Sequence, residues 1–228
     1  MKYIVIGLGF FGSKCASILT SMGHEVLGID NSAEKLEEYK DSFTSVIRMD
    51  TTNINAVKTL PLDDIDAVIV AIGEDVGASI LTLSILKNLD VKRIIGRAIS
   101  QVHHNILAQI GIEEVVLPLE DSAAYLSAIL QLKGVLTLSM INNEYALAEI
   151  KVPEKFVGHL PESIDLEERH KVKLVGIKKP PKEGNVLGSI FRRDYNVELF
   201  FSSDTPFEEK DILVVAGRIS DIKEFIER

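Results

Sequence analysis

The stretch VIGLGFFGSK, residues 5–14, decides the fold expected for this chain. Its three glycines, Gly7, Gly9 and Gly12, have the spacing G-x-G-x-x-G and follow directly on an apolar run at residues 3–6. Glycines so placed allow a tight turn, a close approach of the backbone to a phosphate, and close packing of a helix on a strand. The stretch therefore predicts a strand, a glycine turn and a helix whose N-terminus can receive a phosphate.

The remainder of residues 1–120 repeats this alternation of short apolar runs and helical patterns. The runs predicted as strands are residues 3–7, 25–30, 45–50, 67–73, 93–98 and 114–118. Each is almost continuously apolar, as is typical of parallel strands that are covered on both faces. The sequence therefore predicts an α/β domain, a Rossmann-like doubly wound parallel sheet.

The sequence predicts the caps and the inward faces of two helices in this domain. In the first, the spacing of apolar residues predicts a buried face, and Gly23 follows as a C-terminal cap. Ser32 is expected to cap the N-terminus of the second. The residues expected on the two inward faces are Phe11, Cys15, Ile18 and Met22, and then Leu36, Tyr39 and Phe43.

The pattern changes after residue 120. Residues 121–136 read as a helix that is apolar around much of its circumference, so it packs either against a partner subunit or between two domains. Beyond it come four runs read as strands and a closing helix, which predict a small α+β domain over residues 143–228. These are strands 146–153, 171–179, 196–201 and 211–217, a turn-rich loop at 180–185 and a helix at 220–228. The expected division is thus 1–120, a linking helix at 121–142, and 143–228.

Composition excludes several classes of protein. The net charge is −9 and no Lys/Arg-rich block is present, so nucleic acid is a disfavoured partner. A single cysteine, Cys15, rules out a disulfide within the chain, and the five histidines lack metal-ligand spacing. No apolar run reaches the roughly 18–20 residues that span a bilayer. We expect a soluble, cytosolic protein with no metal site.

Catalytic groups are not evident either. His103 and His104 are adjacent on a predicted helix whose buried stripe is expected to be Val102, Ile106 and Ile110, so both histidines are expected on the solvent side. No nucleophile elbow or Walker lysine is present. The sequence therefore favours a protein that binds a ligand without transforming it.

Asp30 strengthens the case for a nucleotide. It ends the second predicted strand, where a carboxylate can accept hydrogen bonds from both ribose hydroxyls. The same charge repels a 2′-phosphate, so NADP is disfavoured. A tight turn without a ligand is the alternative interpretation.

Other strand ends add candidates at the same edge of the sheet. Asp50 can reach the adenine end of a nucleotide or cap a helix that starts near Asn53. Residues 71–73 are expected to line the crevice with their backbone. Arg97 can meet a phosphate or form a surface ion pair, and Glu120 can face the crevice or begin the next helix.

These motifs together resemble the cytosolic regulatory subunits of bacterial potassium uptake systems of the TrkA/KtrA type, over essentially the whole chain. Such subunits have an RCK N-domain, also called a TrkA N-domain, and a small TrkA C-domain. The segments that carry the resemblance are VIGLGFFG, MGHEVLGIDNSAEKL (22–36), VIRMDTTN (46–53), AVIVAIGEDVGASILTLSILKNL (67–89), VLP (116–118) and FVGHLPESIDLEERHKVKLVGIKK (156–179).

The resemblance implies an adenine nucleotide, either ATP/ADP or NAD/NADH, that sets the shape of a ring of RCK domains. In such a ring, homodimers assemble into a tetramer or an octamer. The ring lies at the inner face of the membrane, under a transporter subunit of the TrkH/KtrB type. The implied site residues are Gly7, Gly9, Phe10, Phe11, Gly12, Asp30, Asn31, Lys35, Asp50, Thr51, Ala71, Ile72, Gly73, Arg97 and Glu120.

Two positions depart from the ATP-responsive members that the chain resembles. Those members carry an arginine where this chain has Phe10, and an acidic residue where it has Leu119, with Glu120 one step further on. Some relatives bind cyclic di-AMP in the C-domain, but residues 171–179 carry no side-chain pattern distinctive enough to assert it. Regulation of a potassium channel or a cation efflux antiporter, and an NAD-dependent oxidoreductase, are the alternative functions.

Overall fold

The computed structural model describes residues 1–142, 144–180, 196–199 and 204–227, which form two compact units, Met1–Asp121 and Ser122–Arg228. The first unit is a six-stranded sheet with every neighbouring pair parallel, in the order β3-β2-β1-β4-β5-β6. Its strands are β1 (Lys2–Ile6), β2 (Glu25–Asp30), β3 (Ser45–Arg48), β4 (Ala67–Val70), β5 (Ile94–Arg97) and β6 (Glu114–Val116). The order reverses between β1 and β4, so the doubly wound Rossmann-like fold is confirmed.

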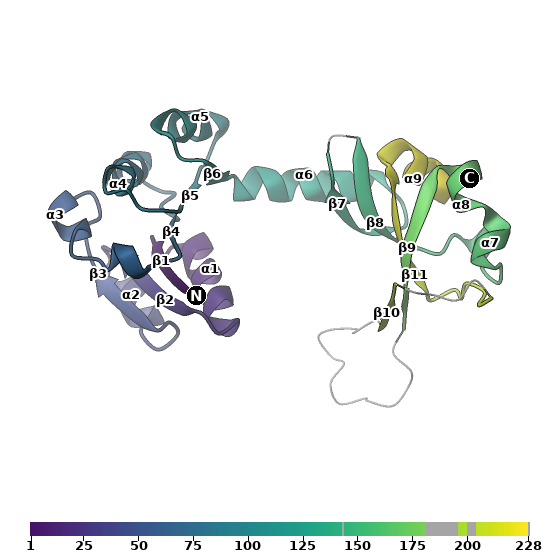
Figure 1. The fold of residues 1–228 in the computed structure, drawn as a ribbon, viewed down its shortest axis with the longest axis horizontal. Helices are drawn as coiled ribbons and strands as arrows, with labels where there is room; N and C mark the ends of the chain where they lie inside the picture. Colours follow the sequence, from purple (N-terminus) through teal and green to yellow (C-terminus); the bar gives the residue numbers. More distant parts are fainter. Residues whose placement is uncertain (143, 181–195, 200–203, 228) are drawn as a thin grey trace. The chain divides into compact units, whose positions relative to one another are not determined.

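Helices cover both faces of this sheet (Figure 1). They are α1 (Phe10–Ser21), α2 (Ala33–Tyr39), α3 (Ile54–Val57), α4 (Val76–Asn88) and α5 (Gln101–Ile110), with a 3₁₀ turn at Leu62–Asp64. Successive residues of β1 serve opposite faces: Val5 packs with α1 and α2, whereas Ile4 and Ile6 pack with α3, α4 and α5. The sheet is therefore buried on both sides, as its apolar strands predict.

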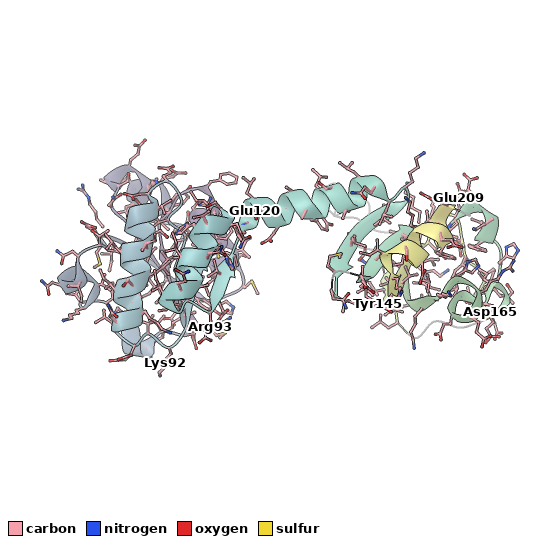
Figure 2. The ribbon with its side chains drawn as sticks, turned by 90° about the horizontal axis from the view of Figure 1, so that it is seen from above. Lys92, Arg93, Glu120, Tyr145, Asp165 and Glu209 are labelled. Carbon is pink, nitrogen blue, oxygen red and sulfur yellow. The ribbon has the colours of Figure 1, made fainter. Side chains whose placement is uncertain are left out.

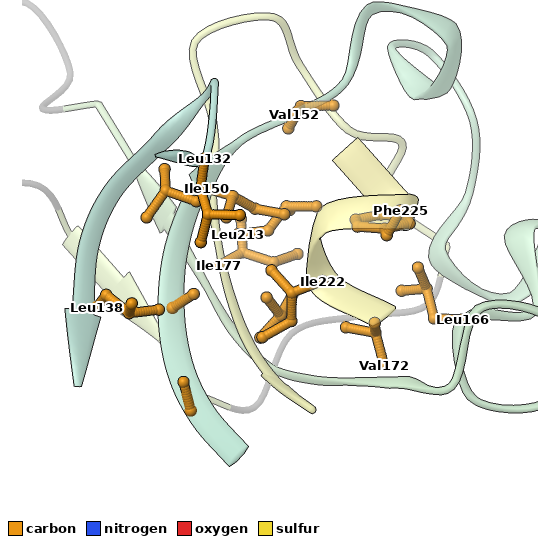
Figure 3. Packing of buried hydrophobic residues seen from close by; sticks show 14 of the residues in the cluster. Leu132, Leu138, Ile150, Val152, Leu166, Val172, Ile177, Leu213, Ile222 and Phe225 are labelled. Carbon is orange, nitrogen blue, oxygen red and sulfur yellow. The ribbon is translucent and has the colours of Figure 1, made fainter. Parts of the chain in front are cut away.

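The second unit is built on a five-stranded antiparallel sheet, in the order β10-β9-β11-β8-β7. Its elements are β7 (Val135–Met140), β8 (Tyr145–Lys151), α7 (Pro161–Ile164), α8 (Leu166–His170), β9 (Val172–Lys179), β10 (Asn196–Glu198), β11 (Ile212–Arg218) and α9 (Ile219–Glu227), with a 3₁₀ turn at Glu154–Phe156. Figure 3 shows Ile222 and Phe225 of α9 packed over the strands that carry Ile150 and Leu213. The expected small α+β unit is confirmed. Residues 181–185 of the predicted loop, 200–201 of the predicted strand and residue 228 lie outside the described residues.

The predicted helix at 121–136 differs from the structure. Helix α6 runs from Pro118 to Gln131, and residues 135–136 belong to β7, which the sequence analysis missed. Gly134 has a left-handed backbone (φ +87°), a conformation that ends a helix. The pairing of β7 with β8 then fixes an extended backbone where the apolar pattern alone suggested more helix.

The inward face predicted for the first helix is wrong in its second half. Ile18 and Met22 are exposed, and the buried residues of α1 are Gly12, Ser13 and Ala16. The glycine turn sets this rotation, because a Cβ at Gly12 would lie 1.9 Å from the carbonyl oxygen of Gly7. Ser32 caps α2 as predicted, and its Oγ accepts a hydrogen bond from Lys35 N (3.4 Å).

The buried stripe predicted for residues 101–110 is wrong at Val102, whereas Ile110 packs against the core as predicted. His103 is only 2% exposed and packs on the same side as Leu107, whereas Val102 is exposed and His104 is half-buried. Ser100 caps α5, accepting a hydrogen bond from His103 N (3.2 Å), and so fixes the rotation of the helix. Burial lowers the pKa of His103.

Candidate functional site

A cleft of about 380 Å³ lies at the carboxyl edge of the parallel sheet, where β1, β2, β3, β4 and β5 end. This is the edge at which open α/β sheets bind ligands, around the point where the strand order reverses. The lining residues are Ile6, Gly7, Gly9, Phe10, Ile29, Asp30, Asn31, Lys35, Met49, Asp50, Thr51, Thr52, Ala71, Ile72, Gly73, Glu74, Asp75, Ala78 and Arg97. Segments that are far apart in the sequence therefore meet in one cavity.

Most of the residues singled out in the sequence line this cleft. Three do not. Phe11 lies beneath the guanidinium of Arg97, Gly12 packs against the turn at Gly7, and Glu120 is exposed in the first turn of α6, as Figure 2 shows. Sequence reasoning missed several lining residues, namely Ile6, Ile29, Met49, Thr52, Glu74, Asp75 and Ala78. Glu74 and Asp75 follow Gly73 directly, so continuing the strand-end argument by two residues would have found them.

The glycine turn leaves the N-terminus of α1 open toward the cleft. Gly7 has φ +90° and donates a hydrogen bond from its N–H to Ile29 O (2.8 Å), which ties the turn to β2. Gly9 occupies the N-cap position and supplies no side-chain cap, and the first turn of α1 carries no acidic residue. The first N–H groups of a helix have no partner within it and carry a partial positive charge. The turn is thus able to receive an anionic group.

The carboxylate of Asp30 is held in one orientation at the end of β2. It is 7% exposed, and its two oxygens accept hydrogen bonds from Leu8 N (2.7 Å, to Oδ2) and Ser32 N (2.9 Å, to Oδ1). Lys35 Nζ lies 3.7 Å from Oδ2. Each oxygen keeps a further lone pair. Asp30 can therefore accept two more hydrogen bonds from a pair of hydroxyls in the cleft.

Asp50 and Thr51 lie in the loop after β3. Asp50 Oδ1 accepts hydrogen bonds from the Thr52 hydroxyl (2.7 Å) and N–H (3.0 Å), which lower the pKa of Asp50. Asn53 itself caps α3, so the alternative reading of Asp50 as that cap is wrong. Thr51 Oγ1 lies 2.8 Å from Thr82 Oγ1 of α4, a buried contact that fixes the loop.

Arg97 extends across the end of β4. Its Nη1 donates to Ala71 O (3.3 Å), and its guanidinium lies 5.4 Å from the centre of the Phe11 ring. Within the described ranges Arg97 forms no ion pair, so the alternative of a surface ion pair finds no support there. A Cβ at Gly73 would lie 2.5 Å from Nη1, so the absence of a side chain there makes room for the guanidinium.

In the part of the chain that the structure describes, no helix has both the length and the apolar character needed to cross a bilayer.

The sheet, the glycine turn and the cleft define a Rossmann-like protein of the nucleotide-binding class. The family model of the TrkA-N domain matches residues 3–118. The chain is 31% identical to Ktr system potassium uptake protein C of Bacillus subtilis, over all of this chain and 96% of that protein. It is 30% identical to Ktr system potassium uptake protein A of the same organism, over 98% of this chain and 95% of that protein. The chain belongs to the TrkA-N domain family, as its resemblance to TrkA/KtrA-type subunits predicts.

Solved structures agree on the fold. The GsuK RCK domain superposes with a TM-score of 0.64 at 15% identity, covering all of this chain and 47% of that chain. The NAD(P)-binding domain of an exopolyphosphatase-related protein from Archaeoglobus fulgidus gives a TM-score of 0.51 at 27% identity, over 57% of this chain and 98% of that chain. At the identity of the first, the likeness concerns the fold alone.

Proposed function

We propose that this chain is the cytosolic regulatory subunit of a potassium uptake system and that an adenine nucleotide bound in the cleft controls it. The observation that carries the proposal is the fixed carboxylate of Asp30 facing the same cleft as the open N-terminus of α1. The full-length similarity to Ktr system potassium uptake proteins A and C supplies the transport context. The name of the Archaeoglobus structure, an NAD(P)-binding domain, supports a nucleotide as ligand.

Each part of the nucleotide has a matching group. The phosphates lie at the first N–H groups of α1, and Arg97 is the cation beside them. Asp30 accepts hydrogen bonds from the ribose hydroxyls, and Asp50 and Thr51 lie at the adenine end. A 2′-phosphate would face the buried carboxylate of Asp30, so NADP is a poor ligand. Phe11 and Gly12 act through packing, and Glu120 lies outside this cleft.

The subunit assembles as a homodimer within a larger ring and works at the inner face of the membrane, through a transporter subunit of the TrkH/KtrB type. Helix α6 supports self-association because it has no buried residue and exposes four large apolar side chains. These are Leu119, Tyr125, Leu126 and Leu130. Three-part organisation, with α6 linking a nucleotide-binding domain to the C-terminal domain, is part of this proposal.

No catalytic step belongs to the proposed function. The groups in the described lining of the cleft that can move a proton are the carboxylates of Asp30, Asp50, Glu74 and Asp75 and the amine of Lys35. His103 is buried on α5 and does not line the cleft. In this proposal the nucleotide is a signal rather than a reactant, and the support for that role is the similarity to Ktr system potassium uptake proteins A and C.

Calorimetric titration with AMP tests the binding claim. Asp30→Asn keeps the shape of the side chain but removes its charge and one acceptor, and hydrogen bonds to a charged group contribute about 1.5–3 kcal/mol each. We expect the AMP affinity to fall about 10- to 100-fold. Asp41→Asn, a change to an exposed carboxylate in the turn after α2, is the matched control and should bind like the original protein. Equal affinity of Asp30→Asn and the original protein would contradict the proposal.

A further inference from the structure

The charges around the cleft do not suit a highly charged ligand. Six charged side chains line it, and four of them are acidic, Asp30, Asp50, Glu74 and Asp75, against Lys35 and Arg97. Lys35 Nζ lies 3.7 Å from Asp30, which leaves Arg97 as the cation of the lining without a carboxylate beside it. Because acidic side chains outnumber basic ones in the lining, each negative charge added to the ligand increases the electrostatic repulsion from the cleft.

The positive groups that remain amount to about one and a half elementary charges. The N-terminus of α1 contributes roughly half an elementary charge, and the Arg97 guanidinium contributes one. Arg97 is also fixed, between the Phe11 ring and Ala71 O, and its Nε is buried without a partner among the described residues. A diphosphate bridge with two negative charges fits this arrangement, whereas a nucleoside triphosphate brings about four.

The aromatic ring of Phe10 favours a ligand that has a second flat ring. Phe10 is the first residue of α1, lines the cleft and is 96% exposed. A large aromatic ring left almost wholly in water beside a ligand cavity is suited to stacking against a flat ring of that ligand. Asp30 ends β2 and Phe10 begins α1, and both line the cleft, so a molecule with two nucleosides can use both.

We propose, on the basis of the proposed nucleotide function, that this cleft selects a dinucleotide, two nucleosides joined by a diphosphate as in NAD, over ATP. The acidic lining disfavours the triphosphate, and Phe10 determines specificity by packing against the second nucleoside.

Titration calorimetry with NAD, ADP-ribose, ATP and AMP tests this, with and without magnesium ions. We expect NAD to bind at least tenfold more tightly than ATP in both buffers. Phe10→Ala should weaken NAD about fivefold or more and leave ADP-ribose unchanged, because ADP-ribose lacks the second base, the flat ring against which Phe10 stacks. Phe10→Arg should strengthen ATP about tenfold, since it adds a charge-assisted phosphate contact. Ile18→Ala, which removes an exposed apolar side chain further along α1, is the control and should change neither ligand.

Three results would overturn the selection. They are ATP binding as tightly as NAD in either buffer, Phe10→Ala weakening NAD and ADP-ribose equally, and Phe10→Arg leaving ATP unchanged. If ATP and AMP bind but NAD does not, the selection fails and the proposed function stands. If none of the four ligands binds, the proposed function itself fails.

Discussion

Two glycines shape the cleft, Gly12 and Gly73, and the sequence predicts the role of only the first. Gly12 could be interpreted correctly from its spacing alone, because the close packing that the G-x-G-x-x-G pattern demands is what the structure shows at Gly7 O. Gly73 could not. The sequence places it at a strand end, but its purpose is to leave space for the guanidinium of Arg97, a residue 24 positions later on β5. A contact between a loop residue after β4 and the last residue of β5 leaves no periodic pattern in the sequence.

Gly73→Ala tests this interpretation at the residue scale. The new methyl group would lie 2.5 Å from Arg97 Nη1, so the guanidinium must move away from Ala71 O and from the phosphate position. We expect the affinity for ADP-ribose in titration calorimetry to fall about tenfold, the size of one charge-assisted contact. Gly77→Ala, in the first turn of α4 and outside the lining, places its methyl group 3.3 Å from Asp75 Oδ1 and not against Arg97, so it should keep the affinity. A Gly73→Ala protein with unchanged affinity would show that Arg97 does not contact the ligand.

At the scale of elements, α5 shows why an apolar pattern can give the wrong helix face. Val102, Ile106 and Ile110 are the more hydrophobic set, yet His103 and Leu107 are the buried ones. The rotation is fixed at the N-terminus, where Ser100 caps the helix, and by packing against α4 and β6. Hydrophobicity is a statistical preference, whereas the cap and the neighbouring elements are specific contacts that only the tertiary structure supplies.

Burial of His103 makes the stability of the first unit depend on pH. Its folded-state pKa lies below the ordinary value of 6.5, because burial disfavours the charged ring. Between that lowered pKa and about 6.5 the unfolded chain binds a proton that the folded one does not, so stability falls as the pH falls through this window. One proton sets the upper limit of this slope, about 1.4 kcal/mol per pH unit. Urea unfolding followed from pH 8 to pH 5 measures it.

His103→Leu should flatten that dependence in the first unit, since it removes the titrating group. His170 of the second unit also has a pKa lowered by burial and by Lys155 and Arg169, so the two units must be monitored separately, for example by hydrogen exchange. An unchanged slope in the first unit of His103→Leu would rule out His103 as its source.

At the scale of the whole molecule, the chain has two units, each with its own core. The change from apolar runs with helices to strands of period two was visible in the sequence, and so was the doubly wound order. The second unit was read less completely: β7 escaped notice because an apolar helix pattern runs into it, and only the left-handed Gly134 and the pairing with β8 separate the two. Long-range strand pairing is the kind of information that local patterns lack.

Separate cores lead to a prediction for unfolding. A ligand that binds only the first unit stabilises that unit by mass action, about 2.7 kcal/mol when its concentration is 100 times the dissociation constant. In hydrogen exchange with saturating ADP-ribose, we expect protection to rise in β1, β2 and β4 and to stay unchanged in β8, β9 and β11. Protection confined to the second unit would place the ligand elsewhere.

The most direct test of the account is potassium flux into vesicles that contain the transporter subunit of the TrkH/KtrB type from the same cell, with this protein added. The account predicts that flux depends on nucleotide concentration when the original protein is present. With Asp30→Asn the nucleotide concentration that gives half of the response should rise about 10- to 100-fold, while Asp41→Asn should behave like the original protein. Two results would contradict the account. One is a flux that depends on nucleotide concentration in the same way with Asp30→Asn as with the original protein, and the other is a flux that the protein does not alter with any nucleotide.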